Sequence, residues 1–358
     1  MATGKLSLKE MKCSNCGADV QFLPGLELTV CGYCGSKFAV SAPAVDVTVD
    51  PPDLIAPFRV DENRFLRAIR GWLSEGTFTP DDVLTSEIET KGTYLPFYAW
   101  SGEYKADWFA SSGYDRQEEY LEMQGDKLVK KRRTVTDWRP SNGVINGKYL
   151  IYTLASDSVD PSLARFCEEV PPSSAVSFDP SQLEGYALEP FEKDRTEFLT
   201  RVEDLVDSIA ESKARPRVPG DRCKDLNCTT TLTSQNCARV YLPFWVTTFL
   251  YGGQPFRCVV DGSDAARIAG TRPVDPDRMQ KAKRLMLPGK LSILAAGISL
   301  VLLPILGMPF LSGAHKWIVL GLVALSIMSA IAGAIAKSVM LSRSRNLRQR
   351  LLEEMNAH

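Results

Sequence analysis

The sequence predicts an α+β protein with an N-terminal zinc ribbon, a central mixed α+β domain with antiparallel β-hairpins, and a C-terminal transmembrane helical hairpin. Two CxxC pairs within residues 13–34 predict the ribbon, and alternating aromatic and polar residues in 94–155 predict the β-hairpins. Two charge-free apolar runs of 20 residues each predict the membrane part. The expected boundaries are 1–41 for the ribbon, 42–57 for a linker, 58–277 for the central domain, 278–290 for a basic juxtamembrane segment, 291–336 for the membrane hairpin and 337–358 for a basic amphipathic tail.

Four cysteines near the N-terminus have the spacing of a structural metal site. Cys13 and Cys16 form one CxxCG motif, Cys31 and Cys34 form another, and fourteen residues separate Cys16 from Cys31. Four thiolates complete the tetrahedral shell of a zinc ion, which leaves no open position for a catalytic water. A redox CxxC pair is the alternative, but it does not require two matched pairs. We therefore expect one structural Zn²⁺ and a reducing compartment rather than disulfides.

The residues around these motifs indicate a small β-structure. Apolar residues alternate with polar ones in 20–22 and 26–30, on either side of Pro24-Gly25, as in a hairpin that joins the two motifs. Residues 37–40 can supply a third strand. The following segment, 42–57, contains four prolines and little periodicity, which favours a semi-extended linker.

Two amphipathic helices are expected in the central domain. Asp61 is a suitable N-cap for a helix that ends near Gly76, because apolar residues recur between them at helical spacing. A second helix is expected over 194–213, with one apolar face and one charged face. The polar residues 214–238 predict a loop.

The remaining part of the central domain favours strands. Residues 127–138 and 148–155 are expected to be extended, and two Asn-Gly pairs between them are typical of turns. The tetrapeptide Tyr-Leu-Pro-Phe occurs at 94–97 and again at 241–244. The repeat indicates either two related β-hairpins in one domain or two packing elements at the starts of strands.

Three further cysteines lie close together in the predicted loop. Cys223, Cys228 and Cys237 would need a fourth ligand such as Cys258 to hold a second metal ion, and their spacing matches no standard pair. A second metal site and simple cytosolic thiols both stay open.

The apolar runs Leu291–Phe310 and Trp317–Ala336 have the length of membrane-spanning helices. As a helix, each run spans about 30 Å, the thickness of the hydrocarbon core of a bilayer. The loop 311–316 is long enough for the chain to reverse direction. Ser329 and Gly333 are small and four residues apart, which favours close approach of the two helices. A helical hairpin buried in a soluble core is the alternative, and such long charge-free runs disfavour it.

Basic residues flank the two runs, whereas the loop between them carries only Lys316. This distribution predicts a two-pass membrane protein with both termini in the cytoplasm. The tail can lie along the membrane, pair with a partner helix or act as a simple stop-transfer segment. The juxtamembrane basic residues are Arg278, Lys281, Lys283, Arg284 and Lys290 before the first run, and Lys337, Arg343 and Arg345 after the second, followed by Arg348 and Arg350.

The charge distribution and the missing motifs exclude several classes of function. The formal net charge is −1, with +1 in residues 1–41 and +9 in 278–358, which leaves −11 for 42–277. An acidic body repels nucleic acid. The sequence contains no GxxxxGK[ST], GxGxxG or HExxH motif, and its two histidines lie in the predicted loop and at position 358. We therefore expect a protein that is not an enzyme.

Several motifs resemble those of bacterial membrane proteins that contain a TFIIB-type zinc ribbon. The motifs are the two CxxCG pairs, Trp72-Leu73, YLPFYAW at 94–100, YLPFWVTTFLYGG at 241–253, GTRP at 270–273 and the apolar runs. The turn after Val260 departs from the family pattern because it lacks a second glycine. Relatives often carry helicase or primosomal names, an activity that a chain without a phosphate loop does not support. Some relatives are encoded beside flotillin-like and phage-shock-type proteins, which implies a role in recruiting membrane-organising partners.

These observations predict a membrane-anchored cytoplasmic adaptor that recruits protein partners to the inner face of the membrane. The expected partners are the lipid bilayer and a cytoplasmic or membrane-associated protein, and self-association stays open. A membrane-tethered zinc ribbon that binds nucleic acid is the first alternative, and an enzyme with a carboxylate or cysteine site is the second.

Overall fold

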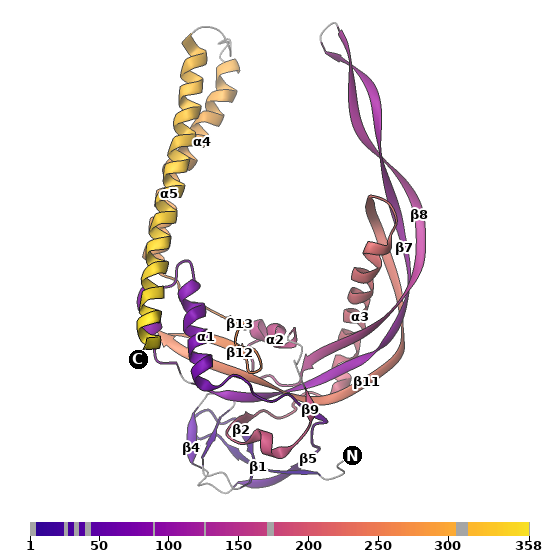
Figure 1. Ribbon diagram of the computed structural model, residues 1–358, viewed down its shortest axis with the longest axis vertical. Coiled ribbons are helices and arrows are strands. Elements are labelled where there is room, and N and C mark those ends of the chain that lie inside the picture. The colour runs from indigo at the N-terminus through magenta and orange to yellow at the C-terminus, as the bar shows by residue number, and fades with distance from the viewer. Residues whose placement is uncertain are drawn as a thin grey trace. The chain divides into compact units, whose positions relative to one another are not determined.

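A computed structural model describes residues 5–24, 28–31, 36–39, 44–88, 90–124, 127–169, 175–305 and 314–357 (Figure 1). Over these residues the chain is mixed α+β, as expected, with mainly antiparallel strands and a long apolar helix on the C-terminal side. It divides into two compact units. Unit 1 comprises Met1–Arg59 and Lys91–Phe244, and unit 2 comprises Val60–Thr90 and Trp245–His358. The region 58–277 is therefore shared between two units, and strand β11 (Arg222–Tyr251) runs from the first into the second.

Unit 1 is built on a sheet with the strand order β11-β7-β10-β2-β1-β5, with β8 added on β7, β6 on β11, and β9 on β6. Strands β3 and β4 form a separate pair. The bounds are β1 Leu6–Lys12, β2 Asp19–Phe22, β3 Leu28–Val30, β4 Lys37–Ala39, β5 Val45–Val49, β6 Leu54–Ile55, β7 Gly92–Gln124, β8 Lys127–Leu154, α2 Pro161–Glu168, β9 Val176–Ser177, η2 Pro180–Leu183, β10 Ala187–Leu188, η3 Arg195–Phe198, α3 Leu199–Ala214 and η4 Arg215–Arg217.

The N-terminal strands differ in part from the expected hairpin. Strand β2 pairs with β1, and β3 pairs with β4, so residues 37–39 do supply a strand, whereas 25–27 lie outside the described residues. The expected linker also contributes, because β5 and β6 fall within 42–57 and β5 pairs with β1. Pro51, Pro52 and Pro57 lie outside both strands, where their missing N–H groups break no strand hydrogen bond.

The two Tyr-Leu-Pro-Phe segments are partners in the same sheet. Leu242 of β11 lies opposite Leu95 of β7, and each proline lies opposite the tyrosine of the other copy, Pro96 with Tyr241 and Pro243 with Tyr94. Both tyrosine rings are buried, with their centroids 6.4 Å apart. The repeat thus forms a locally two-fold antiparallel pair at the base of two β-hairpins, β7–β8 and β11–β12.

The expected turns within 138–148 do not form. Strand β8 is continuous, and the glycines of the two Asn-Gly pairs lie opposite large aromatic residues of β7, Gly143 opposite Trp108 and Gly147 opposite Tyr104. A Cβ atom at either glycine would approach the aromatic ring to within 2.6 Å and 2.5 Å respectively. The glycines therefore leave room for aromatic rings that cover them across the strand pair, a known means of supporting glycine in a sheet.

The core of unit 1 lies between this sheet and helix α3. Trp100, Tyr104 and Trp108 of β7 pack there with Val202 and Val206 of α3. The expected helix at 194–213 is confirmed as the 3₁₀ turn η3 followed by α3. The expected loop at 214–238 is wrong, because 222–238 belong to β11, where four threonines between 229 and 233 suit a strand.

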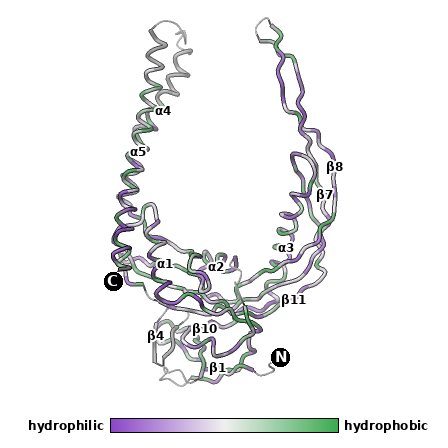
Figure 2. Tube along the Cα trace, in the orientation of Figure 1, coloured by the Kyte–Doolittle hydropathy of each residue, from purple (hydrophilic) through white to green (hydrophobic). Residues whose placement is uncertain are grey.

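Beyond the core, β7 and β8 continue as a two-stranded ribbon. Figure 2 shows hydrophilic residues along its outer part. Cross-strand ion pairs join its basic and acidic side chains, including Arg133 with Glu118 at 2.8 Å and Arg132 with Glu119 at 3.0 Å. Opposite charges on facing positions stabilise such a ribbon in the absence of a core.

A buried carboxylate lies next to β10, the short strand that joins the N-terminal strands to β7. Glu189 is 1 % exposed, and neither of its carboxylate oxygens has a hydrogen-bond partner of ordinary geometry among the described residues. Burial raises the pKa of Glu189 to about 7, although the charge of Lys91 acts in the opposite direction and that of Glu192 in the same one. Unit 1 thus contains a buried carboxyl group beside β10, and the ionisation of this group costs free energy.

Unit 2 combines the end of β11 with helices from both parts of the chain. Helix α1 begins after the N-cap Asp61 and ends before Gly76, as expected. In the turn after Val260, the Asp261 side chain accepts hydrogen bonds from the N–H and hydroxyl of Ser263, so the missing glycine does not prevent the turn. The bounds are α1 Glu62–Glu75, η1 Asp81–Thr85, β12 Gln254–Asp261, β13 Ile268–Gly270, α4 Pro276–Ile305 and α5 Ala314–Ala357.

Helices α4 and α5 pack against each other. A Cβ atom at Gly333 of α5 would lie 2.4 Å from the carbonyl oxygen of Leu285 of α4, which confirms the expected close approach at this glycine. The expected tail continues α5 without a break to Ala357. Residues 306–313, which include Phe310, lie outside the described residues.

Candidate functional site

Three of the four predicted metal ligands meet in unit 1. The Sγ atoms of Cys13, Cys16 and Cys31 all lie within 4.8 Å of one another, and those of Cys16 and Cys31 are 3.6 Å apart. Cys34 lies outside the described residues. In a tetrahedral site with Zn–S bonds of about 2.3 Å, neighbouring sulfurs lie about 3.8 Å apart. The donor set and its spacing therefore fit a metal ion.

The backbone around Cys13 has the form of a metal-binding knuckle. The Cys13 N–H donates to the carbonyl of Ala18 at 2.8 Å, and the Gly17 N–H donates to the carbonyl of Cys13 at 2.9 Å. Gly17 has a φ of 77°, a conformation that glycine adopts without strain. The Asn15 N–H donates to the Cys13 sulfur at 3.4 Å.

Cys31 is joined to Ser36, and Ser36 in turn to the first motif. The Cys31 N–H donates to the carbonyl of Ser36 at 3.0 Å, and the Asn15 side-chain amide donates to the Ser36 hydroxyl at 2.8 Å. Cys13 and Cys31 are buried and pack with Val20, while Cys16 is exposed. The centre thus has its own small apolar base on β2.

In the part of the chain that the structure describes, the other cysteines do not form a second centre. Cys223, Cys228 and Cys237 are spread along β11, opposite Ser112, Trp108 and Trp100 of β7. Among the described residues, Cys13, Cys16 and Cys31 make up the one group whose ligand atoms lie close enough to hold a metal ion. The spacing of a strand, about 3.3 Å per residue, separates cysteines that seemed clustered in the sequence.

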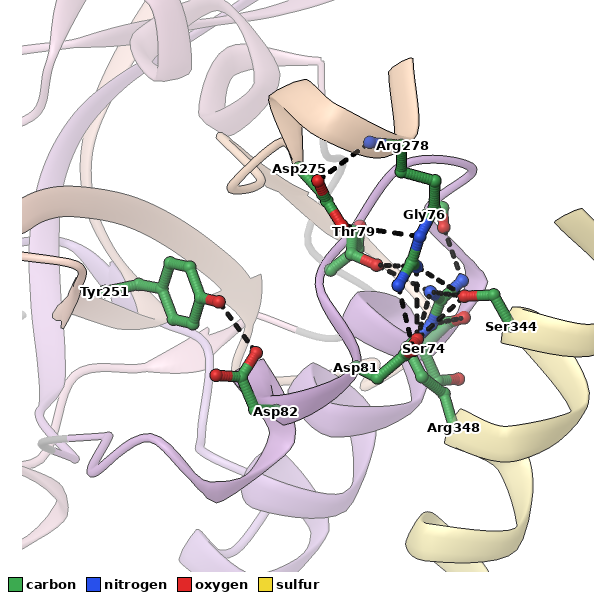
Figure 3. A network of polar contacts seen from close by, with 10 residues as sticks. All are labelled: Ser74, Gly76, Thr79, Asp81, Asp82, Tyr251, Asp275, Arg278, Ser344 and Arg348. Carbon is green, nitrogen blue, oxygen red and sulfur yellow. Dashed lines mark hydrogen bonds and ion pairs between the residues drawn. The ribbon is translucent and has the colours of Figure 1, made fainter. Parts of the chain in front are cut away.

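A second polar site, in unit 2, surrounds Asp81 (Figure 3). Arg348 of α5 is 1 % exposed and donates hydrogen bonds to three backbone carbonyls, those of Ser74 at 3.0 Å, Gly76 at 2.6 Å and Thr79 at 2.6 Å. Two of these carbonyls belong to the C-terminal end of α1, which has no basic residue in its own last turn. Arg348 therefore supplies the cation that the end of a helix favours.

Asp81 joins this arginine to helix α4. Arg278 of α4 donates to both carboxylate oxygens of Asp81, at 3.1 Å and 2.8 Å, and Arg348 lies 3.1 Å from one of them. The Ser344 hydroxyl donates to the same carboxylate at 2.7 Å. Two-oxygen contacts of this kind are among the strongest in proteins. We call Asp81, Arg278, Ser344 and Arg348 the arginine cluster.

The charges in the arginine cluster are balanced. Asp275 lies 3.4 Å from Arg278 and its side chain also accepts the Arg278 backbone N–H at 2.9 Å. Burial alone would raise the pKa of Asp81, but hydrogen bonds from Arg278 and Ser344 and the charges of Arg278 and Arg348 hold it below its ordinary value. The arginine cluster thus joins η1 to the start of α4 and to the C-terminal part of α5.

The family motifs at Trp72 and 270–273 also meet in unit 2. The Arg272 guanidinium lies over the Trp72 ring, 3.9 Å from its centroid. The Thr271 N–H donates to the carbonyl of Arg257 at 2.9 Å. The Trp72 face is thus covered from within the unit, which accounts for these residues without a ligand.

The described residues of the two predicted membrane runs lie in α4 and α5. Among the described helices, Val323–Met355 is the one segment long and apolar enough to cross a membrane. Leu291 of α4 and Ala336 of α5 are exposed, and Trp317 lies within α5. Arg278 is engaged by carboxylates and only 16 % exposed. The other predicted juxtamembrane cations are exposed except for the half-buried Lys337: Lys281, Lys283, Arg284, Lys290, Arg343 and Arg345.

Sequence analysis did not find the arginine cluster. Arg348 is 267 residues from Asp81, and no motif marks either residue. A weak signal was present, since Ser344, Arg348 and Leu352 recur every four residues on one face of α5 and all are at least half-buried. Arg348, the charged residue of this stripe, was counted among the basic residues expected at a membrane.

The chain matches no protein-family model, no curated protein and no solved structure. Its resemblance to TFIIB-type zinc-ribbon membrane proteins therefore rests on the motifs alone.

Proposed function

We propose that this protein is a non-enzymatic adaptor that is anchored in a bacterial cytoplasmic membrane and recruits a protein partner. In this proposal Cys13, Cys16, Cys31 and Cys34 hold a structural Zn²⁺, and α4 and α5 form a two-pass anchor with both termini in the cytoplasm. The observation that carries the proposal is the arginine cluster. It fastens the long apolar helix α5 to the folded body of unit 2, as an anchored scaffold requires.

The charge pattern favours a protein partner over nucleic acid. The most basic stretch of unit 1, on β8, has Lys131, Arg132 and Arg133 paired with glutamates of β7. Paired cations contribute little to phosphate binding, which depends on several unpaired Lys and Arg on one face. The proposed partner is a membrane-associated protein of the flotillin-like or phage-shock type, as the family resemblance implies.

Affinity purification from detergent extracts tests the adaptor proposal. Cys13→Ser and Cys31→Ser should lose the partners that the wild-type chain retains, because the cysteine centre would no longer fold. Cys228→Ser, at a partly exposed position on β11, is the matched control and should retain them. An identical partner set in all four samples would contradict the proposal.

Fractionation and epitope tags test the anchor separately. The full chain should sediment with membranes and require detergent for release. Tags at both termini should be shielded from protease in intact cells. Tags on opposite sides of the membrane would reject the two-pass topology and leave a single span within Val323–Met355.

A further inference from the structure

A groove in unit 2 lies beside the arginine cluster. It has a volume of about 610 Å³, and one wall consists of the apolar side chains of Ala336, Val339, Met340 and Leu347 of α5. Its polar side carries Arg343 together with Asp81, Arg278 and Ser344 of the arginine cluster. A concave site with an apolar wall and a few convergent polar groups is the usual form of a site for an amphipathic molecule.

The position of the groove along α5 fits the surface of a bilayer. Ala336 ends the charge-free run, and Lys337 is the first charged residue after it. Arg343 follows Ala336 by seven residues, which along a helix is about 10 Å. The groove therefore begins where a hydrocarbon core would end, and its arginine lies at the depth of lipid head groups.

The charges of the groove favour an anion. Arg278 and Arg348 already neutralise Asp81, since both lie within 3.1 Å of its carboxylate. Arg343 is exposed, and no ion pair joins it to a carboxylate in the described part of the chain. Arg343 thus provides a positive charge at the mouth of an apolar groove.

We propose that this groove binds an anionic phospholipid, with its phosphate at Arg343 and an acyl chain along Val339, Met340 and Leu347. The inference rests on the proposed membrane anchor. It adds a lipid of defined charge as a ligand that contacts α5 next to the arginine cluster. A zwitterionic lipid lacks the net charge that Arg343 recognises, and an apolar partner helix lacks the phosphate.

Lipid binding to the purified full-length protein in detergent tests this proposal. The probes are phosphatidylglycerol and phosphatidylcholine of the same acyl chains, measured by native mass spectrometry. We expect phosphatidylglycerol to bind about fivefold more tightly, the gain typical of one basic residue at an anionic surface. Arg343→Gln should reduce this preference to near one. Arg350→Gln removes an exposed arginine of the same helix outside the groove, and it should keep the preference.

Three outcomes would overturn the proposal. They are equal binding of the two lipids by the wild-type chain, an unchanged preference in Arg343→Gln, and an equal loss in Arg350→Gln. Millimolar inorganic phosphate should not displace the lipid, and displacement would identify a site for free phosphate instead. Failure of the proposed anchor would appear differently, as wild-type protein in the soluble fraction of cells.

Discussion

The cysteine centre and the arginine cluster secure two parts of one chain in contrasting ways. The cysteine centre joins residues within a short segment, through ligand atoms that one metal ion can hold. The arginine cluster joins residues up to 274 positions apart, through charges and backbone carbonyls. The first would be completed by a metal ion from outside the chain, whereas the second consists only of residues of the chain. The cysteine centre can therefore be recognised from residues that are close in the sequence. The arginine cluster forms only when residues far apart in the sequence come together in the fold.

Removal of the metal should give the largest effect. In Cys31→Ser, or after dialysis against a strong chelator, the segment 5–49 should lose its fold, because metal binding supplies about 10–16 kcal/mol in comparable small sites. Hydrogen exchange of β1 and β2 and the zinc content per chain are the measurements. Exchange in α1 should stay unchanged. Slow exchange in β1 without bound zinc would show that the apolar base alone folds this segment.

Breaking the arginine cluster should have the next largest effect. Asp81→Asn leaves the fully buried Arg348 without its carboxylate, whereas Arg278 keeps Asp275, so unit 2 should lose about 3–5 kcal/mol of stability. Thermal unfolding in detergent measures this loss. Asp277→Asn changes an exposed carboxylate at the start of α4 and should be neutral. Equal stability of the two variants would mean that the arginine cluster holds nothing together.

Glu189 should make the stability of unit 1 depend on pH. Its pKa of about 7 in the folded state exceeds that of an unfolded glutamate, about 4.3, so the folded state binds more protons. Stability should therefore fall by about 3 kcal/mol as the pH rises from about 5 to 8. Glu189→Gln should flatten this dependence in thermal unfolding, and the exposed Glu184→Gln should not. A wild-type stability that does not change over this pH range would show that a partner in solution compensates the charge of Glu189.

The contact between α4 and α5 should give the smallest effect. Gly333→Ala places a methyl group against the Leu285 carbonyl and should cost about 1–3 kcal/mol. At Gly321 a Cβ atom meets nothing within 4 Å, so Gly321→Ala should be neutral or slightly stabilising. The measurement is the thermal stability of each variant in the same detergent. A neutral Gly333→Ala would indicate that the two helices separate in a lipid environment.

The sequence predicted the features that depend on near neighbours. The N-cap at Asp61, the end of α1 at Gly76 and the three cysteine ligands follow from residue types at short spacing. Residues 222–238 of β11 were missed because these polar residues lie on a sheet whose partner strand β7 is more than a hundred positions away. The two Asn-Gly pairs were wrongly interpreted as turns for the same reason. The rings of Tyr104 and Trp108 cover the glycines of these pairs from the neighbouring strand. Because this contact comes from a distant part of the chain, the residues around each glycine predict a turn where the chain forms a strand.

The burial of Arg348 has a consequence for how the protein is made. Helix α1 and Asp81 leave the ribosome early, but the arginine that closes the end of α1 is translated 267 residues after Asp81. Until then the carbonyls of Ser74 and Gly76 must be hydrated, and unit 2 is incomplete. A chain in which α5 fails to pack on the body would also leave these carbonyls without their arginine. Unit 2 therefore completes its fold only after the C-terminal part of α5 has been made, although α1 is among the first of its elements.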